Sequence, residues 1–361
     1  MFEYFPISKS DFDGTVLVTG AGGCIGSWAL ALLTRASIPV AAFDLTDDKR
    51  RPGLLMSDAE LGKIKWLTGD IADLDSVLNA ARSSGARAII HLAALQVPFC
   101  KADPVAGARV NVVGTINVFE AARKLGIKRI SYASSIAAHG AMEGHGTLAT
   151  LYGAYKHCNE QTSKVYSQDW GVHSVGLRPG VVYGIGRDQG MTSKTTVAIL
   201  AAAAAKPYTV PFRGPISWLH AGEVASAFVR AVAQERTGAP VFDINGVPST
   251  VEQSLELLKK IAPAMQVGWS GDALPFPMDL SDEPVRSFLG NYGSFFWPLV
   301  LIKSEHLRTL PIGMLFFDTN YGRQTNLIMA ASVMNIIPLI ILFVTSQKYL
   351  VKGIQMGAVK G

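Results

Sequence analysis

TVLVTGAGGCIG, residues 15–26, joins a short run of β-branched residues to a glycine-rich turn. The run predicts a buried strand, and Gly20, Gly23 and Gly26 follow it with the spacing G-x-x-G-x-x-G. Such a turn needs glycine because a Cβ atom would keep a pyrophosphate from approaching the backbone. The amides that open the next helix then supply partial positive charge. The stretch therefore predicts a nucleotide-binding loop between the first strand and the first helix.

Outward from this loop, strands and helices alternate as far as about residue 262. Short apolar runs rich in Val and Ile predict strands that are buried on both faces. They are TVLVT (15–19), PVAAF (39–43), IKWL (64–67), RAIIHL (87–92), RISY (129–132), HSVGLR (173–178) and PVFDI (240–244). Longer helical stretches separate them, among them 104–125, 155–170, 198–206 and 222–234. This alternation predicts an α/β fold with a Rossmann-type, doubly wound parallel sheet.

Composition and charge narrow the class of protein. Of 361 residues, 49% are hydrophobic and only 17% charged, which hints that part of the chain avoids water. Residues 1–290 carry 27 Lys+Arg against 26 Asp+Glu, whereas residues 291–361 carry 6 against 2. A nearly neutral body offers no broad basic face, so no nucleic-acid partner is expected. Three cysteines without paired spacing predict no disulfide framework and no metal site, and they favour the cytoplasm for this part.

Asp44 closes the second predicted strand, eighteen residues after Gly26. A carboxylate at this place accepts hydrogen bonds from ribose hydroxyls and repels a 2′-phosphate. The position therefore predicts NAD rather than NADP as the cofactor. The adjacent cations Lys49, Arg50 and Arg51 oppose that preference.

Tyr152 and Lys156 lie one helical turn apart at the start of a predicted helix, so their side chains share a face. A tyrosine whose pKa is near 10 is a poor base at neutral pH. A neighbouring ammonium group favours the phenolate and lowers the pKa of the hydroxyl. The spacing thus predicts Tyr152 as a general acid/base whose pKa Lys156 lowers.

The motifs follow one another in a definite order. After the glycine loop and Asp44 come HLAA (91–94), Asn111, SYASS (131–135) and the Tyr152/Lys156 pair. With this order, residues 14–290 resemble the extended short-chain dehydrogenase/reductase family, which contains nucleotide-sugar epimerases and dehydratases. The resemblance implies an NAD-dependent oxidoreductase or epimerase that acts on a sugar, a sugar acid or a nucleotide sugar. Epimerase and dehydrogenase both stay open, because the two reactions need the same residues.

The resemblance also assigns roles to the matching residues. The implied catalytic residues are Ser135, Tyr152, Lys156 and Asn111, the last as support for a proton-relay water. The implied cofactor-binding residues are Gly20, Gly23, Cys24, Ile25, Gly26, Asp44, Asp70, Ile71, Ala93, Lys156, Pro179 and Val182. Ser135, Arg187 and Arg213 are the candidate substrate contacts, because a guanidinium group can hold a phosphate or carboxylate with two hydrogen bonds.

Two departures from the family pattern are informative. Ile136 and Ala137 stand where the dehydratases carry Asp and Glu, so dehydration is not expected. Cys24, within the glycine loop, is interpreted as a small packing residue and not as a reactive thiolate. No sequence feature predicts a bound metal ion.

The last seventy residues differ from the rest in composition. NLIMAASVMNIIPLIILFV, residues 326–344, contains no charged residue and as a helix would reach ~28 Å, about one hydrocarbon core. It predicts a transmembrane helix, with a buried helix as the alternative. From about residue 293 the chain resembles the C-terminal end of the permease subunits of carbohydrate ABC transporters. The matching blocks are FFWPLVLI, HLRTLPIGML, MAASVMNIIPLIILF and QKYLVKGIQMGAVKG.

The sequence therefore predicts three segments. Residues 1–178 form an NAD-binding domain with the catalytic motif, 179–290 a small substrate-binding part, and 291–361 a permease-like tail. We expect a sugar-type substrate and a cytoplasmic enzyme part, with the tail in the cell membrane. The alternative function is that of a membrane component of a carbohydrate transporter, joined to a vestigial NAD-binding domain. The sequence leaves a homodimer open.

Overall fold

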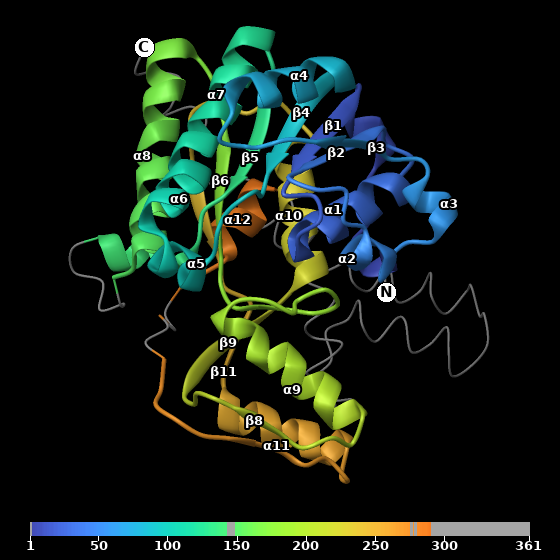
Figure 1. Ribbon diagram of the computed structural model, residues 1–361, viewed down its shortest axis with the longest axis vertical. Coiled ribbons are helices and arrows are strands. Elements are labelled where there is room, and N and C mark those ends of the chain that lie inside the picture. The colour runs from blue at the N-terminus through green and yellow to red at the C-terminus, as the bar shows by residue number, and fades with distance from the viewer. Residues whose placement is uncertain (1, 143–148, 275–276, 278–279, 290–361) are drawn as a thin grey trace, which may run out of the picture. The chain divides into compact units, whose positions relative to one another are not determined.

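The computed structural model describes residues 2–142, 149–274, 277 and 280–289, which belong to one compact unit, Met1–Asn291. Among them, a seven-stranded parallel sheet has the order β10-β6-β5-β4-β1-β2-β3 (Figure 1). Its strands are β1 (Thr15–Thr19), β2 (Val40–Asp44), β3 (Lys65–Thr68), β4 (Ala86–His91), β5 (Arg129–Ala133), β6 (Val175–Pro179) and β10 (Val241–Ile244). Each corresponds to one of the seven predicted runs, with ends that agree within two residues. The predicted parallel sheet is confirmed.

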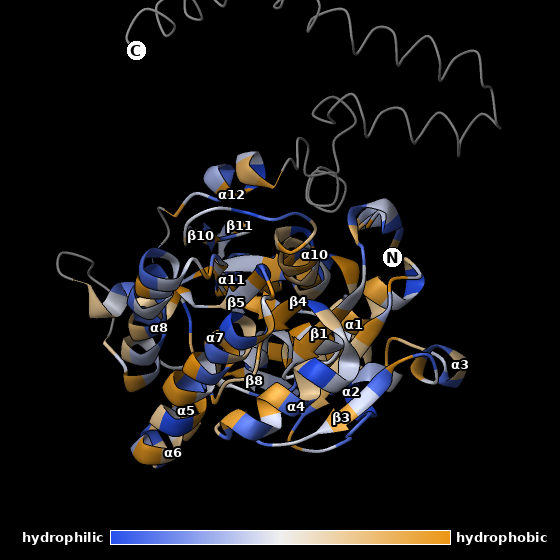
Figure 2. Ribbon diagram, turned by 90° about the horizontal axis from the view of Figure 1, so that it is seen from above, coloured by the Kyte–Doolittle hydropathy of each residue, from blue (hydrophilic) through white to orange (hydrophobic). Residues whose placement is uncertain are grey.

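Helices cover both faces of the sheet because successive side chains of a strand point to opposite sides. In β1, Val16 and Val18 belong to one hydrophobic core, whereas Leu17 belongs to the other. The first core is closed by α1 (Cys24–Arg35), α10 (Ala221–Ala231) and α12 (Glu283–Phe288), and the second by α4 (Leu74–Ser84), α7 (Gly114–Leu125) and α8 (Leu151–Trp170). Figure 2 shows the hydrophobic residues concentrated on central strands such as β1 and β4.

A smaller lobe follows β6 and lies at one end of the sheet (Figure 1). Its strands form a three-stranded sheet, β11-β9-β7, and a two-stranded sheet, β12-β8. They are β7 (Val182–Tyr183), β8 (Tyr208–Val210), β9 (Pro215–His220), β11 (Val247–Thr250) and β12 (Val267–Trp269), accompanied by α9 (Lys194–Ala203) and α11 (Val251–Ile261). Because β10, α10 and α12 return to the main sheet, the predicted segment 179–290 contributes to both parts of the unit.

Shorter helices connect the strands at the rim of the sheet. They are α2 (Arg50–Gly53), α3 (Asp58–Leu61), α5 (Val97–Ala102), α6 (Pro104–Ala108) and the 3-10 helices η1 (Phe2–Tyr4), η2 (Lys9–Asp11), η4 (Ile136–Ala141) and η5 (Met191–Ser193). Between α6 and α7 the helix passes through a π-helical turn, Arg109–Val113, that contains Asn111.

Within the part of the chain that the structure describes, no helix is long and apolar enough to cross a bilayer. The predicted span 326–344 and the whole predicted tail, 291–361, lie outside the described residues.

Candidate active site

A cavity of about 600 Å³ opens where the glycine loop, the ends of the parallel strands and the loop after β7 meet. Residues from the N-terminal and the C-terminal halves of the unit line it together, from Gly20 to Pro277. All the predicted site residues except Asn111 and Arg213 line this cavity. They are Gly20, Gly23, Cys24, Ile25, Gly26, Asp44, Asp70, Ile71, Ala93, Ser135, Tyr152, Lys156, Pro179, Val182 and Arg187.

The glycines of the loop line the cavity with backbone atoms that no side chain covers. Gly20 has a φ of +68°, in the left-handed region that glycine adopts without steric cost. A Cβ atom at Gly20 would lie 2.6 Å from the nitrogen of Ala93, and one at Gly26 would lie 2.3 Å from the carbonyl oxygen of Gly20. Helix α1 begins directly after this turn, so its first amides point toward the cavity. The loop therefore fits a dinucleotide pyrophosphate, which needs close backbone approach and helix amides.

Asp44 stands at the end of β2, on the wall of the same cavity. Its Oδ2 accepts a hydrogen bond from Gly22 N at 2.8 Å, and its Oδ1 accepts one from Leu45 N at 2.8 Å. Two backbone donors thus fix the carboxylate while leaving lone pairs that ribose hydroxyls can use. This arrangement fits the adenosine half of NAD.

Tyr152 and Ser135 are brought together by an unusually close approach of two backbones. Helix α8 begins with Thr150 as its N-cap, whose side chain accepts a hydrogen bond from Gly153 N at 3.0 Å. A Cβ atom at Gly153 would lie 2.2 Å from the carbonyl oxygen of Ala137, in the turn that follows Ser135. Glycine at 153 therefore lets the first turn of α8 pack against this turn, and Tyr152 and Ser135 line the same cavity.

Burial and two neighbouring groups act on the pKa of the Tyr152 hydroxyl. Burial raises its pKa above the usual value of 10, while the hydrogen bond with Ser135 and the charge of Arg187 act to lower it. The lowering by Lys156 stays a prediction, and the cation that lowers the pKa of this hydroxyl in the structure is Arg187. This cation comes from a loop that a helical spacing could not reveal.

Lys156 lies one turn further along α8 and is almost completely buried. Its Nζ donates a hydrogen bond to the carbonyl oxygen of Ala133, at the end of β5, and lies 5.6 Å from the centre of the Tyr152 ring. Burial lowers the pKa of this ammonium group to about 8. The side chain thus anchors α8 to the sheet beside the cavity.

A buried charged network behind Ser135 was missed by the sequence analysis. Arg178 donates from Nε and Nη2 to the two carboxylate oxygens of Glu160, both at 2.7 Å, and Ser134 donates to Glu160 as well. Asp243 accepts from His139 Nε2 at 2.7 Å and lies 3.6 Å from Arg178 Nη1. The network joins α8, β6, β10 and the segment around Ser135, so it holds the catalytic wall to the sheet.

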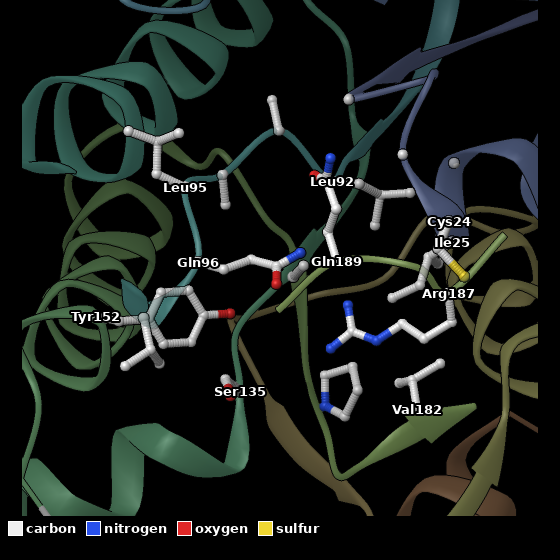
Figure 3. Close-up of a pocket in the computed structure, with 18 of the residues that line it drawn as sticks. Cys24, Ile25, Leu92, Leu95, Gln96, Ser135, Tyr152, Val182, Arg187 and Gln189 are labelled. Atoms are coloured by element: carbon white, nitrogen blue, oxygen red, sulfur yellow. The ribbon is translucent and has the colours of Figure 1, made fainter. Parts of the chain in front are cut away.

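Arg187 reaches the cavity from the loop between β7 and η5 (Figure 3). Figure 3 shows its guanidinium and the hydroxyl of Tyr152 pointing into the same space, with Gln96 and Gln189 beside them. Arg187 Nη2 donates to Thr192 at 3.1 Å, whereas its buried Nε has no hydrogen-bond partner in the structure. Gln96 and Gln189 line the cavity but belong to no spacing motif, so the sequence offered no signal for them.

Asn111 and Arg213 do not line the cavity. Asn111 is buried in the π-helical turn, where its amide accepts from Leu95 N at 2.7 Å and donates to Leu95 O at 2.9 Å. Both ends of this amide therefore shape the wall behind the cavity. Arg213 is exposed, and its guanidinium lies 5.8 Å from the centre of the Trp269 ring. The structure therefore does not bring Arg213 together with the other candidate residues, and its substrate contact stays a prediction.

The cysteine in the glycine loop packs, as its small size suggests. Burial raises the pKa of Cys24 to about 11, and its thiol donates to the carbonyl oxygen of Ile185 at 3.7 Å. It is therefore a neutral thiol at physiological pH. Among the described residues, no cluster of His, Cys, Asp and Glu side chains is arranged to hold a metal ion.

Comparison with known proteins identifies one family and two kinds of relative. Residues 16–245 match the model of the NAD dependent epimerase/dehydratase family. The UDP-glucose 4-epimerase of Rhizobium leguminosarum bv. trifolii is 29% identical over 275 residues, which cover 69% of this chain and 82% of that protein. The solved structure of the Thermus thermophilus UDP-glucose 4-epimerase in complex with NAD has a TM-score of 0.63 and 24% identity, and covers 76% of this chain and 92% of that one. This likeness shows the fold.

A second similarity concerns a transport protein. The arabinooligosaccharides transport system permease protein AraQ of Halalkalibacterium halodurans is 42% identical over 73 residues, or 20% of this chain. The chain spans about a quarter of the length of that permease, 26%.

Proposed function

Because the chain belongs to the NAD dependent epimerase/dehydratase family, we propose that it is an NAD-dependent epimerase that acts on a hydroxyl of a sugar or nucleotide sugar. The main support for this proposal is that Ser135, Tyr152 and Lys156 line one cavity with the glycine loop and Asp44. The sugar substrate is supported by the names of the relatives, several of which are UDP-glucose 4-epimerases.

The chain's own residues divide the chemistry among them. NAD would be held by the glycine loop, Asp44 and Lys156, and when bound it supplies a hydride acceptor and donor. Ser135 orients the reacting hydroxyl through its Oγ, and Tyr152 takes the proton from that hydroxyl as the C–H bond is oxidised. Arg187 keeps the tyrosine oxygen within a positive field, which favours the phenolate needed for this step. In an epimerisation Tyr152 would give the proton back to the oxygen of the keto sugar, and bound NAD would supply the hydride for the opposite face of that sugar.

The test is the substitution Tyr152→Phe, with Tyr155→Phe as its matched control. Removing the acid/base hydroxyl should lower kcat by about 10²- to 10⁴-fold while the protein still binds NAD. Tyr155, on the same helix, donates to the carbonyl oxygen of Pro104 at 2.9 Å and does not line the cavity, so its variant should retain turnover.

The assay incubates the full chain with NAD and UDP-glucose, and then with other sugars, and separates the products by chromatography. A new epimer without accumulation of NADH is the expected result, whereas steady accumulation of NADH would assign a dehydrogenase. A Tyr152→Phe variant as active as the parent would contradict the proposed mechanism.

For the tail we propose insertion into the cell membrane through residues 326–344. The proposal is supported by nineteen residues without a charge and by the similarity to the AraQ permease. The tail should stay with the membranes when they are extracted with carbonate, and release of the whole chain into the wash would overturn the proposal. A transporter function is the weaker alternative, since the similarity covers a quarter of that permease whereas the family model spans residues 16–245.

The cytoplasm is proposed as the compartment of the enzyme part. The three cysteines, Cys24, Cys100 and Cys158, are all unpaired, as expected of a chain in a reducing compartment.

A further inference from the structure

Three cations follow β2, and each of them already has a partner. Lys49 Nζ lies 5.1 Å from the centre of the Trp66 ring, and Arg50 pairs with Asp48 at 2.6 Å. Arg51 pairs with the carboxylate of a residue far along the chain, Asp188 in the loop after β7. The cations that opposed an NAD preference in the sequence are therefore engaged elsewhere.

Arg51 lies close to the place where an adenosine ribose would be bound. Gly22 donates its N–H to Asp44 Oδ2 at 2.8 Å and accepts a hydrogen bond from Arg51 Nη1 at 3.2 Å through its carbonyl. The carboxylate that receives ribose hydroxyls and the guanidinium of Arg51 are thus attached to the two sides of one residue. Both side chains line the cavity. A phosphate on the ribose 2′-oxygen would meet Arg51 if this guanidinium were available.

Asp188 makes Arg51 unavailable. Its Oδ1 accepts from Arg51 Nε at 2.9 Å and lies 2.7 Å from Arg51 Nη2. Together with the bond from Nη1 to Gly22, these contacts engage all three nitrogens of the guanidinium. Asp188 lines the same cavity as Asp44, and its pairing with Arg51 leaves no unpaired positive charge on that guanidinium for a phosphate.

We propose that Asp188 is a specificity-determining residue, which makes the site select NAD over NADP by occupying Arg51. The inference rests on the proposed function, since it presumes a nicotinamide dinucleotide in this cavity. Arg50 cannot take the same role, because its side chain is 83% exposed and does not line the cavity. The selectivity thus depends on an ion pair between the loop after β2 and the loop after β7, and not on Asp44 alone.

The experiment measures the dissociation constants of NAD and NADP for the full chain by isothermal titration calorimetry, without any sugar present. In the variant Asp188→Asn the ratio of the NADP constant to the NAD constant should fall by about tenfold, because the freed guanidinium can pair with the 2′-phosphate. In the double variant Asp188→Asn with Arg51→Ala the ratio should return toward that of the parent.

Asp48→Asn is the matched control for the loss of one carboxylate from the cavity wall. It frees Arg50, which lies outside the cavity, so the ratio should change less than in Asp188→Asn. An unchanged ratio in Asp188→Asn, an equal change in Asp48→Asn, or a gain that survives Arg51→Ala would each overturn the proposal. Since no turnover is measured, these outcomes are separate from the loss of activity that tests Tyr152.

Discussion

The two walls of the cavity are built in different ways. The cofactor wall consists mainly of backbone at the ends of β1, β2 and β4, and it rests on cores of thirty-four and nineteen buried apolar residues among those described. The opposite wall consists of side chains on the loop after β7, in a lobe whose own core contains six such residues. The side chain of Asp188 on this loop is 61% exposed, whereas Lys156 on α8, which packs on the main sheet, is almost completely buried.

This difference shows where the molecule is rigid. The backbone of the cofactor wall is packed against large cores, so its shape cannot change unless the sheet moves. Such a wall suits a cofactor that is the same in every reaction. A thin lobe with polar loop residues can vary its side chains at little cost in stability, so it suits selectivity, both between substrates and between NAD and NADP. Substitutions in the two regions should therefore have unequal effects.

The largest inequality is expected between two glutamates, one in each region. Glu160 is buried and accepts two hydrogen bonds from Arg178, one from Nε and one from Nη2. Glu252 in the lobe accepts a hydrogen bond from Gly214 N at 3.1 Å. Glu160→Gln should lower the free energy of unfolding by about 3–5 kcal/mol, because the buried guanidinium loses its main counter-charge. Glu252→Gln should cost no more than about 1 kcal/mol, because the glutamine carbonyl oxygen can still accept the hydrogen bond from Gly214 N.

Urea unfolding followed by circular dichroism at pH 7 gives both numbers. Equal losses in the two variants would contradict the view that the main sheet, and not the lobe, carries the stability of the unit. Asp243, which also lies near Arg178, can compensate part of the charge, so the loss in Glu160→Gln should fall toward the lower end of that range.

The same contrast explains how far the fold could be predicted from the sequence. The five inner strands of the main sheet, β6, β5, β4, β1 and β2, are mostly buried, so they stand out as continuous apolar runs, whereas the edge strands β3 and β10 are only partly buried. The strands of the lobe were all missed, including β9 with six residues and β11 with four. Three of them are very short, because β7 has only two residues, and β8 and β12 only three. Such short segments contain no detectable period, and only their packing in three dimensions makes them strands.

The site residues also differ in how far the sequence could predict them. Residues whose role depends on the backbone or on a helical turn, such as Gly20, Asp44 and Tyr152, were placed at the cavity by their spacing. Arg213 does not line the cavity, and the sequence could not show this because an arginine in a loop has no periodic context that fixes its direction. The Arg51–Asp188 pair joins positions 137 residues apart, and no local pattern specifies such a partner.

A smaller effect is expected when single glycines in the two regions are replaced by alanine. Gly26→Ala places a Cβ atom 2.3 Å from the carbonyl oxygen of Gly20, so the loop must shift. We expect a loss of about 1–3 kcal/mol in the free energy of unfolding. We also expect NAD to bind at least about tenfold more weakly, because the helix amides move away from the pyrophosphate.

In the lobe, Gly268 of β12 has open space around its ideal Cβ position and no positive φ. Gly268→Ala should therefore be neutral or stabilise the fold by about 0.4–1 kcal/mol, since alanine reduces the freedom of the unfolded chain. Gly53 in α2 also has open space around its ideal Cβ position, but it lies in the half of the unit that contains the cofactor wall. Gly53→Ala is therefore the control for location, since it adds a methyl group to this half without a close contact. Thermal unfolding and NAD titration of the three variants measure these effects. If Gly53→Ala weakens NAD binding as much as Gly26→Ala, the requirement for glycine is general to this half of the unit and is not due to the close contact at Gly26.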